Sequence, residues 1–352
     1  MNDYDSVNEE NRLPSAGFLL VDKPKGVTSH DIVAACRGVL HTRHVGHAGT
    51  LDPMATGLLV IGFGSATRLL KYVVGTSKTY EAVIRLGAST STDDAEGDIA
   101  GPQTEAAAAR IDALSSDPTP IDAAIADHLT GTIDQIPSTF SAIKVNGERA
   151  YDLAREGKDV QLAARKITIS DFTRNDVRAV TDSETDAHYL EVTVSVTCSA
   201  GTYIRALARD LGALLEVGGY LTYLRRTRIG AFTVESATVA ATKVKTFTDR
   251  QGVVQHRLKA NIDAEDVAKA ARDVTEVIGE VLPVVDIDEA QLREIGFGRD
   301  IDATVAAPTA AIFRSAHSAP RLCAIVEPGS MRGTAHPIAV FPRDTRSDDS
   351  KR

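Results

Sequence analysis

Hydrophobic and polar positions alternate, or form short apolar runs, at several places along the chain, and both patterns predict β-strands. GFLLVD (residues 17–22) is a short apolar run of the kind found in buried strands. KTYEAVIRLG (residues 78–87) reads as a second strand, with apolar and polar residues partly alternating. The same patterns predict further strands in GLLVIGFG (57–64), ARKITISDF (164–172), YLEVTVSVTCSA (189–200) and YLTYLRRTRIGAFTV (220–234).

Helical spacing occurs in fewer segments. GTYIRALARDLGALL (residues 201–215) has apolar residues at 204, 207, 208, 211, 214 and 215, which form one face of a helix. Ser29 is the predicted N-cap of a helix over about 30–40, and residues 67–75 also have helical spacing. We expect residues 88–120 to be a loop with a short helix, and residues 240–280 to be mostly helical because they are charged and rich in Ala.

Turn signals favour hairpins over parallel crossovers. Asn146-Gly147 stands between two short extended runs, which is the strongest short-range signal of a β-hairpin. Because strands and helices are interspersed and hairpin signals dominate, we expect an α+β fold with a mixed, mainly antiparallel sheet flanked by helices.

The pattern also predicts how the chain is divided. We expect a disordered tail over residues 1–16, one large domain over 17–244 and a helical bridge over 245–281. Short apolar runs separated by Gly and Pro then predict a small β-rich domain over 282–342, followed by a polar tail over 343–352. A chain of 352 residues has room for one large and one small domain.

Charge changes this picture locally. The net charge is −9, which at first argues against nucleic acid. Residues 17–80 nevertheless hold seven Lys/Arg and three Asp, a balance of +4, whereas residues 81–135 hold two Arg and eleven Asp/Glu, a balance of −9. A polyanion responds to the local field, so a basic face can exist on this acidic protein. Ordinary solvated surface explains the same counts, and charge alone leaves both interpretations open.

Composition bounds the compartment. The three cysteines lie far apart without metal-type spacing, and no apolar run reaches the length of a membrane helix. The polar, acidic N-terminus has no apolar core of a signal peptide, so we expect a reduced, cytoplasmic protein. His41, His44 and His47 recur every third residue, but no Cys pair or paired carboxylate accompanies them, so we expect no metal. GFGSAT (residues 62–67) lacks the remainder of a phosphate loop and reads as a strand-to-helix turn.

The loop GHAGTLDPMATGLL (residues 46–59) is the most unusual segment. It holds a single acid, Asp52, which Pro53 stiffens and several glycines surround. An Asp before a Pro often starts a turn, and that role alone would be favoured for an isolated pair. A rigid carboxylate in an open, small-residue loop also suits nucleophilic or acid–base chemistry.

This loop resembles the catalytic motif of the TruB family, bacterial tRNA pseudouridine synthases that act on uridine 55 of the T arm. Other motifs follow in the family's order between about residues 17 and 232: GFLLVDKPKGVTSHDIV, KTYEAVIRLG, QIPSTFSAIKVNGERAYDLAREG, CSAGTYIRALARDLG and LRRTRIGAF. The resemblance implies the pseudouridine synthase fold for residues 17–244, with a thumb-like insertion over about 137–157. Residues 282–342 resemble a PUA-like domain only loosely; such a domain would be expected to touch the acceptor end of the tRNA.

The resemblance also implies roles for individual residues. Asp52 matches the catalytic aspartate, Tyr80 the active-site tyrosine and Arg205 the arginine that pairs with the aspartate. Without the surrounding motifs, Tyr80 would read as an aromatic on a strand and Arg205 as a charge on a helix surface. The residues expected to contact substrate or RNA are Lys23, His47, Tyr203, Lys144, Arg149, Arg225 and Arg226.

The implied reaction breaks the glycosidic bond of a flipped uridine and rejoins the uracil through C5, without cofactor, metal or redox chemistry. The sequence leaves open whether Asp52 attacks the sugar, attacks the base or assists removal of a ribose proton. We expect tRNA as the partner, a monomer, no obligate protein partner and no membrane. Two rivals stay open: a guide-RNA-directed relative of the same superfamily, and an RNA chaperone, whose activity can coexist with the isomerase.

Overall fold

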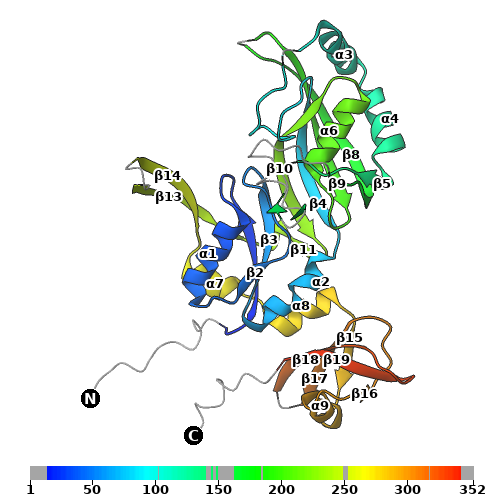
Figure 1. The fold of residues 1–352 in the computed structure, drawn as a ribbon. Helices are drawn as coiled ribbons and strands as arrows, with labels where there is room; N and C mark the ends of the chain where they lie inside the picture. The colour runs from blue at the N-terminus through cyan, green and yellow to red at the C-terminus, as the bar shows by residue number, and fades with distance from the viewer. Residues whose placement is uncertain are drawn as a thin grey trace.

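The computed structural model of the chain describes residues 14–101, 103–139, 144–145, 148–149, 162–183, 185–248, 253–316 and 318–341. An elongated body carries the large sheet, and a smaller β-rich unit follows it at one end (Figure 1). None of the helices in these residues is both long enough and apolar enough to cross a membrane.

A ten-stranded mixed sheet runs through the body. Its main path is β12 (Thr238–Val239), β1 (Gly17–Lys23), β3 (Thr56–Phe63), β10 (Gly219–Ile229), β4 (Lys78–Leu86), β9 (His188–Cys198), β8 (Arg165–Thr181) and β5 (Gly131–Gln135). β2 (Val45–His47) pairs with β3, and β11 (Phe232–Thr233) pairs with β10. All of these pairs are antiparallel except β1 with β12 and β3 with β10. The prediction of an α+β fold with a mixed, mainly antiparallel sheet is therefore confirmed.

Helices cover the sheet because each presents one apolar stripe to it. α3 (Glu105–Ser116), α4 (Thr119–His128) and α6 (Ile204–Leu214) pack on β4, β8 and β9 in one core. α1 (Ser29–Leu40) and α7 (Ala264–Ala270) pack on β1 and β3 in another. The 3-10 helix η2 (Gly64–Leu69) and α2 (Leu70–Val74) follow β3 directly.

Two local predictions are corrected by the structure. Thr28, not Ser29, caps α1: its hydroxyl accepts from the Asp31 amide, while the Asp31 carboxylate accepts from Thr28 in return. Ser29 is instead buried and bonded to Leu51. Residues 88–120, expected to hold one short helix, hold α3 and the start of α4. The segments before and after Pro118 both contain several Ala residues, and both are helical.

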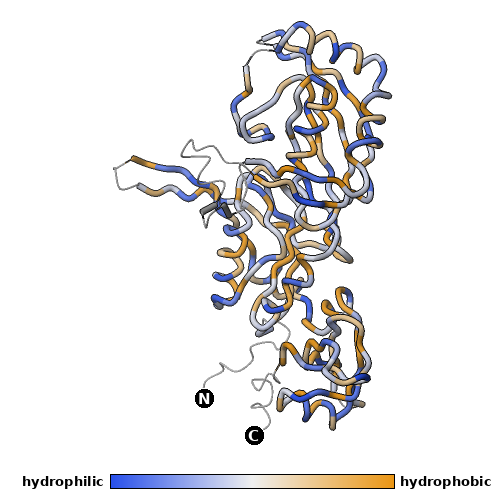
Figure 2. Tube along the Cα trace, turned by 45° about the vertical axis from the view of Figure 1, so that its right-hand side comes forward, coloured by the Kyte–Doolittle hydropathy of each residue, from blue (hydrophilic) through white to orange (hydrophobic). Residues whose placement is uncertain are grey.

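The expected helical bridge is the larger error. Its first part is a β-hairpin, β13 (Ala241–Thr248) paired with β14 (Val254–Asn261). Among the described residues of this region, the helices are α7 and α8 (Val274–Val281). Thr and Val alternate with lysines along β13, and β-branched residues favour strands. The hairpin stands away from the body in Figures 1 and 2.

The C-terminal unit is β-rich, as predicted. Its five strands lie in the order β15 (Val284–Ile287), β17 (Thr309–Ser315), β18 (Ser318–Pro328), β19 (Thr334–Val340) and β16 (Ile301–Asp302), with α9 (Glu289–Gly296) alongside. α8 joins this unit to the body through a shared apolar core. The Asn-Gly hairpin is also confirmed at backbone level, since β6 (Lys144–Val145) pairs with β7 (Glu148–Arg149).

Candidate active site

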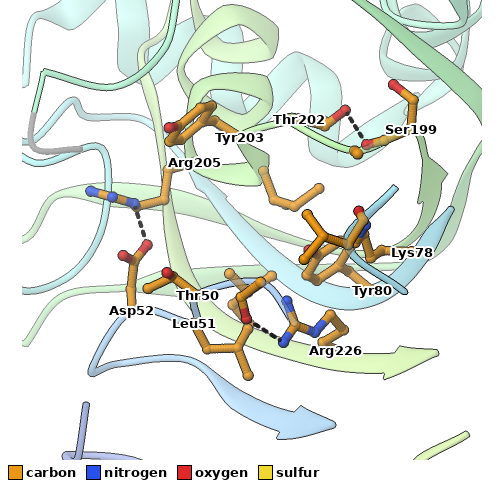
Figure 3. Close-up of a pocket in the computed structure, with 16 residues that line it drawn as sticks. Thr50, Leu51, Asp52, Lys78, Tyr80, Ser199, Thr202, Tyr203, Arg205 and Arg226 are labelled. Atoms are coloured by element: carbon orange, nitrogen blue, oxygen red, sulfur yellow. Dashed lines mark hydrogen bonds and ion pairs between the residues drawn. The ribbon is translucent and has the colours of Figure 1, made fainter. Parts of the chain in front are cut away.

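A cavity of about 270 Å³ opens beside the junction of β10 with β3 and β4. Its walls come from the loop of residues 49–52, from β4, from β10 and from residues 199–205 at the start of α6. In Figure 3, Asp52 and Arg205 face one another on one side of the cavity, while Tyr80 and Lys78 approach from β4 on the other. The fold thus brings together Asp52 and Arg205, which are 153 residues apart in the sequence.

The loop that carries Asp52 is fixed on both sides of this residue. Before it, the buried Ser29 hydroxyl accepts from the Leu51 amide at 2.8 Å and donates to the Leu51 carbonyl at 3.0 Å. After it, the Pro53 carbonyl accepts from the Gly26 amide at 2.8 Å and from the Lys23 ammonium at 3.4 Å. Bonds to both neighbours fix the backbone at Asp52 without using the carboxylate oxygens.

Arg205 joins two carboxylates. Its Nε lies 3.0 Å from Oδ2 of Asp52, and its Nη1 lies 3.4 Å from Oδ2 of Asp94 and donates to the Thr92 carbonyl at 2.9 Å. Arg205 and Asp94 are buried, whereas the Asp52 side chain is 39% exposed and faces the cavity. A planar guanidinium suits such double pairing, because its donors are fixed in a fork. Asp94 and Thr92 therefore orient Arg205, and Arg205 orients Asp52.

Lys78 and Tyr80 lie two residues apart on β4 and so share one face of the strand. Burial raises the pKa of the Tyr80 phenol, and the positive charge of Arg226 opposes this rise. The phenol is therefore protonated at neutral pH. Burial, with Arg226 acting in the same direction, lowers the pKa of the Lys78 ammonium to about 8. This lysine donates to the carbonyls of Val74 and Thr76.

Arg226 lies under the cavity on β10. It is 1% exposed, and its guanidinium donates to the Leu58 carbonyl at 2.8 Å and to the Gly49 carbonyl at 3.0 Å. Its backbone lies so close to Gly57 that a Cβ there would come within 2.2 Å of the Arg226 carbonyl oxygen. Gly57, at φ +100°, is thus required where β3 meets β10. Arg226 stabilises the wall of the cavity and links it to the Asp52 loop.

The residues expected to contact RNA fall into different settings. Lys23 is fully buried and also donates to the Val27 carbonyl at 2.8 Å, so we reassign it from RNA contact to holding the Asp52 loop. Burial lowers its pKa to about 8, against the opposing effect of Asp52. Arg225 is paired with Asp22 at 2.6 Å, and Arg226 is a buried cavity wall. In each case the charge has a structural partner that the sequence did not reveal.

Tyr203 and His47 were also expected to contact the substrate or RNA. Tyr203 lines the cavity, and its backbone is held by both ends of the buried Gln135 amide, at 2.9 and 3.0 Å. His47 is half-buried on β2, and burial lowers its pKa, so it is neutral at pH 7. The side chains of Lys144 and Arg149 lie outside the described part of the chain; only their backbones are described.

Sequence reasoning missed two residues of the site. Lys78 lies two positions before Tyr80, and strand alternation alone puts both on one face, so this signal was available. Asp94 lies in STDDAEGD, where three other acids stand within four residues of it and composition suggests a solvated loop. Only the fold shows that Asp94 is 4% exposed and paired with Arg205.

The arrangement supports acid–base or nucleophilic chemistry on a planar group. An oriented carboxylate faces a cavity whose opposite wall carries a protonated phenol and a cation. The aromatic ring of Tyr80 offers a stacking face for a nucleobase. A cavity of this kind can hold one extruded base but not a duplex.

Solved structures with a similar fold include chains of H/ACA RNP complexes. A chain from an H/ACA RNP bound to a substrate RNA containing 2'-deoxyuridine matches 97% of this chain and 94% of its own length, at a TM-score of 0.58 and 21% identity. A chain from an archaeal box H/ACA sRNP complex matches 97% of this chain and 95% of its own, at a TM-score of 0.58 and 20% identity. At these identities the likeness shows the fold alone.

Sequence comparisons are more specific. Residues 37–204 match the model of the TruB family pseudouridylate synthase N-terminal domain, and residues 205–270 match that of the tRNA pseudouridylate synthase B C-terminal domain. The tRNA pseudouridine synthase B of Bifidobacterium longum (strain DJO10A) is 45% identical over 93% of this chain and 98% of the relative. That of Arthrobacter sp. (strain FB24) is 46% identical over 93% and 96%. The chain belongs to the TruB family of pseudouridylate synthases.

Proposed function

We propose that this protein converts uridine 55 in the T arm of tRNA to pseudouridine. The observation that carries the proposal is the ion pair of Asp52 and Arg205 facing Tyr80 across a base-sized cavity, in a chain of the TruB family. The isomerisation changes neither the oxidation state nor the composition of the nucleotide. Acid–base and nucleophilic side chains, such as those of this site, are therefore the groups that the reaction needs.

The proposed mechanism begins with extrusion of the target base. Leaving the stack costs a few kcal/mol, which contacts inside the cavity must repay. Tyr80 provides a face for stacking, and Arg205 keeps the Asp52 carboxylate aimed at the nucleotide. These three residues are the proposed catalytic set, with Asp52 as the reacting group.

The net change in bonding is the same for every chemical route. The bond between N1 of the uracil and C1′ of the ribose breaks, the uracil turns, and a bond forms from C5 to C1′. The proton on C5 leaves to solvent, and N1 takes up a proton in its place. Asp52 acts by attacking the sugar, by attacking the base or by assisting removal of a ribose proton. Because Tyr80 is protonated at neutral pH, a role for it as a base requires it first to lose that proton.

We also propose the remaining assignments. The catalytic domain spans residues 17–244. The resemblance places a thumb-like insertion that closes on the T loop at about 137–157, most of which lies outside the described residues. The β-rich unit over 282–342 contacts the acceptor end of the tRNA. The protein acts as a monomer in the cytoplasm, where its three cysteines, all free and buried, stay reduced.

The test is tritium release from tRNA transcripts labelled as [5-³H]uridine. We expect release from a transcript with uridine at position 55, and none from a matched transcript with cytidine there. Release from both transcripts would overturn the site of modification. Binding without release from either would overturn the enzyme assignment and favour the chaperone or the guide-RNA-dependent relative.

A further inference from the structure

The strands of the β13–β14 hairpin carry a net positive charge, whereas the chain as a whole is negative. The two strands hold four Lys/Arg (Lys243, Lys245, Arg257 and Lys259) and no Asp or Glu, in a protein of net charge −9. All eight residues of β13 are exposed. Figure 2 shows polar segments along this arm where it leaves the body.

The register places all four cations on one face of the ribbon. Lys243 lies directly opposite Lys259, and Lys245 directly opposite Arg257. Because side chains alternate along a strand, positions 243 and 245 share a face with 257 and 259. Like charges directly opposite one another destabilise a strand pair, so the arrangement opposes folding of the arm unless an anion lies on it.

The neighbourhood supplies only part of the compensating charge. Arg257 pairs with Asp31 of α1 at 3.1 Å, and the Lys243 ammonium donates to the Asn261 side chain at 2.9 Å. Asp31 is itself committed to the Thr28 cap. Among the ion pairs of the described residues, the four cations of the arm thus have one carboxylate partner, Asp31. The row formed by these four side chains keeps a net positive charge.

There is room beside this row for a backbone of RNA. A groove of about 330 Å³ separates the arm from α1, with Lys243 and Lys259 on one wall. The opposite wall consists of Asp31, Ala34, Ala35, Gly38 and Val39. Asp31 is paired with Arg257, and the other four have small side chains that leave the wall open. A Cβ placed at Gly38 would meet nothing within 4 Å.

The other face of the arm contacts Gly26, in the turn after β1, and this turn is bonded to the loop that carries Asp52. Leu258 lies against Gly26, so closely that a Cβ there would come within 2.8 Å of the leucine Cδ1. The Gly26 amide donates to the Pro53 carbonyl, next to Asp52. The eight residues of each strand extend about 26 Å at roughly 3.3 Å per residue. The arm is therefore linked, through Gly26 and Pro53, to the loop that carries Asp52.

We propose that the β13–β14 arm is a second RNA-docking surface, on which Lys243, Lys245 and Lys259 contact phosphates of the tRNA whose uridine occupies the cavity. The inference rests on the proposed function for its ligand. Contacts to phosphates position an RNA without reading its sequence, so the arm contributes affinity and orientation, and the cavity contributes selection of the base.

The test compares Lys245→Gln/Lys259→Gln with a matched control, Lys166→Gln/Arg178→Gln, which removes the same charge from exposed positions on β8. We expect the arm variant to bind tRNA about ten-fold more weakly at physiological salt, and the slope of log affinity against log salt to fall by about two. KM for tRNA should rise with kcat unchanged. Lys245→Arg/Lys259→Arg should restore wild-type affinity, which separates loss of charge from loss of the hairpin.

An arm variant with the affinity and salt slope of the control would overturn the inference and leave the row of cations for a partner such as an acidic protein. Failure of the proposed function has a different signature, since the wild-type enzyme would then release no tritium in the same assay. Equal losses in the Gln and Arg variants would also overturn the inference, because charge would not be the cause.

Discussion

The cavity and the β13–β14 arm both contain several cations but place them in opposite settings. In the cavity, Arg205, Arg226 and Lys78 are each less than a tenth exposed and bonded to named carbonyl or carboxylate oxygens. In the arm, Lys243 and Lys245 are exposed and face other cations across the ribbon. A buried charge must be paired to be tolerated, whereas an exposed row of like charges persists only at a cost.

The difference separates two tasks. Cations with fixed partners hold other groups in place, so the cavity should control the rate of the chemical step and the stability of the fold. Cations without neighbouring acids attract a polyanion, so the arm should control affinity and its dependence on salt. Substitutions in the cavity should therefore leave the affinity for tRNA nearly unchanged, and substitutions in the arm should leave the rate of the chemical step nearly unchanged.

The largest effect is expected from Asp52→Asn. The amide keeps the shape of the side chain but removes the charge that pairs with Arg205 and the oxygen that reacts. Tritium release should fall by about four orders of magnitude or more, the scale seen when a reacting carboxylate of a catalytic unit is removed. Affinity for tRNA should stay within a few-fold. Turnover above about 1% of wild type would sink the assignment of Asp52.

Arg205→Met should lower both turnover and stability. It leaves the buried Asp94 without its partner, which typically costs about 3 kcal/mol of unfolding free energy, and it frees Asp52 to rotate. We expect kcat to fall by about two orders of magnitude. Denaturant unfolding of Arg205→Met/Asp94→Asn provides the control: it should recover most of the stability but none of the turnover. Recovery of both would mean that Arg205 acts only through folding.

The sequence predicted the fold well where local patterns and packing agree. The alternation in residues 78–87 gave β4 to within one residue, and the helical stripe in 201–215 gave α6, because each element buries one face on the same core. It failed at residues 241–261, where Ala and charged residues suggested a helix. There the hairpin projects from the body, so no buried face imposed a clear period on the sequence.

The site was predicted in part for a related reason. Asp52, Tyr80 and Arg205 were identified from motifs, and the structure brings all three to one cavity. Lys23 and Arg226 were also expected at the RNA, yet both are buried. A basic residue in a sequence looks the same whether it will bind phosphate or carbonyl oxygens. Burial decides between these roles, and burial here depends on strand pairing between segments about 170 residues apart.

A pH series on Lys78→Met should show how the buried cations differ from ordinary surface charge. The native protein releases the Lys78 proton near pH 8, whereas the unfolded chain holds it to about 10.5. Between these values unfolding takes up a proton, so rising pH stabilises the wild-type fold through this group. Relative to Lys78→Met, wild type should gain on the order of 2 kcal/mol of unfolding free energy from pH 8 to 10.5. Urea melts at each pH measure this difference, and a constant difference would contradict the lowered pKa.

The smallest expected effect is the most direct measure of independence between the two regions. Asp52→Asn combined with Lys245→Gln/Lys259→Gln should bind tRNA with a free-energy change equal to the sum of the two separate changes. Sites without shared partners usually add to within about 0.5 kcal/mol. The arm does contact Gly26 through Leu258, and the Gly26 amide donates to the Pro53 carbonyl next to Asp52. A coupling well above that limit, measured by tRNA titration of the four proteins at one salt concentration, would show that docking on the arm is transmitted through this contact to Asp52. Additivity would instead establish that the arm holds the RNA while the cavity, already rigid, acts on the base alone.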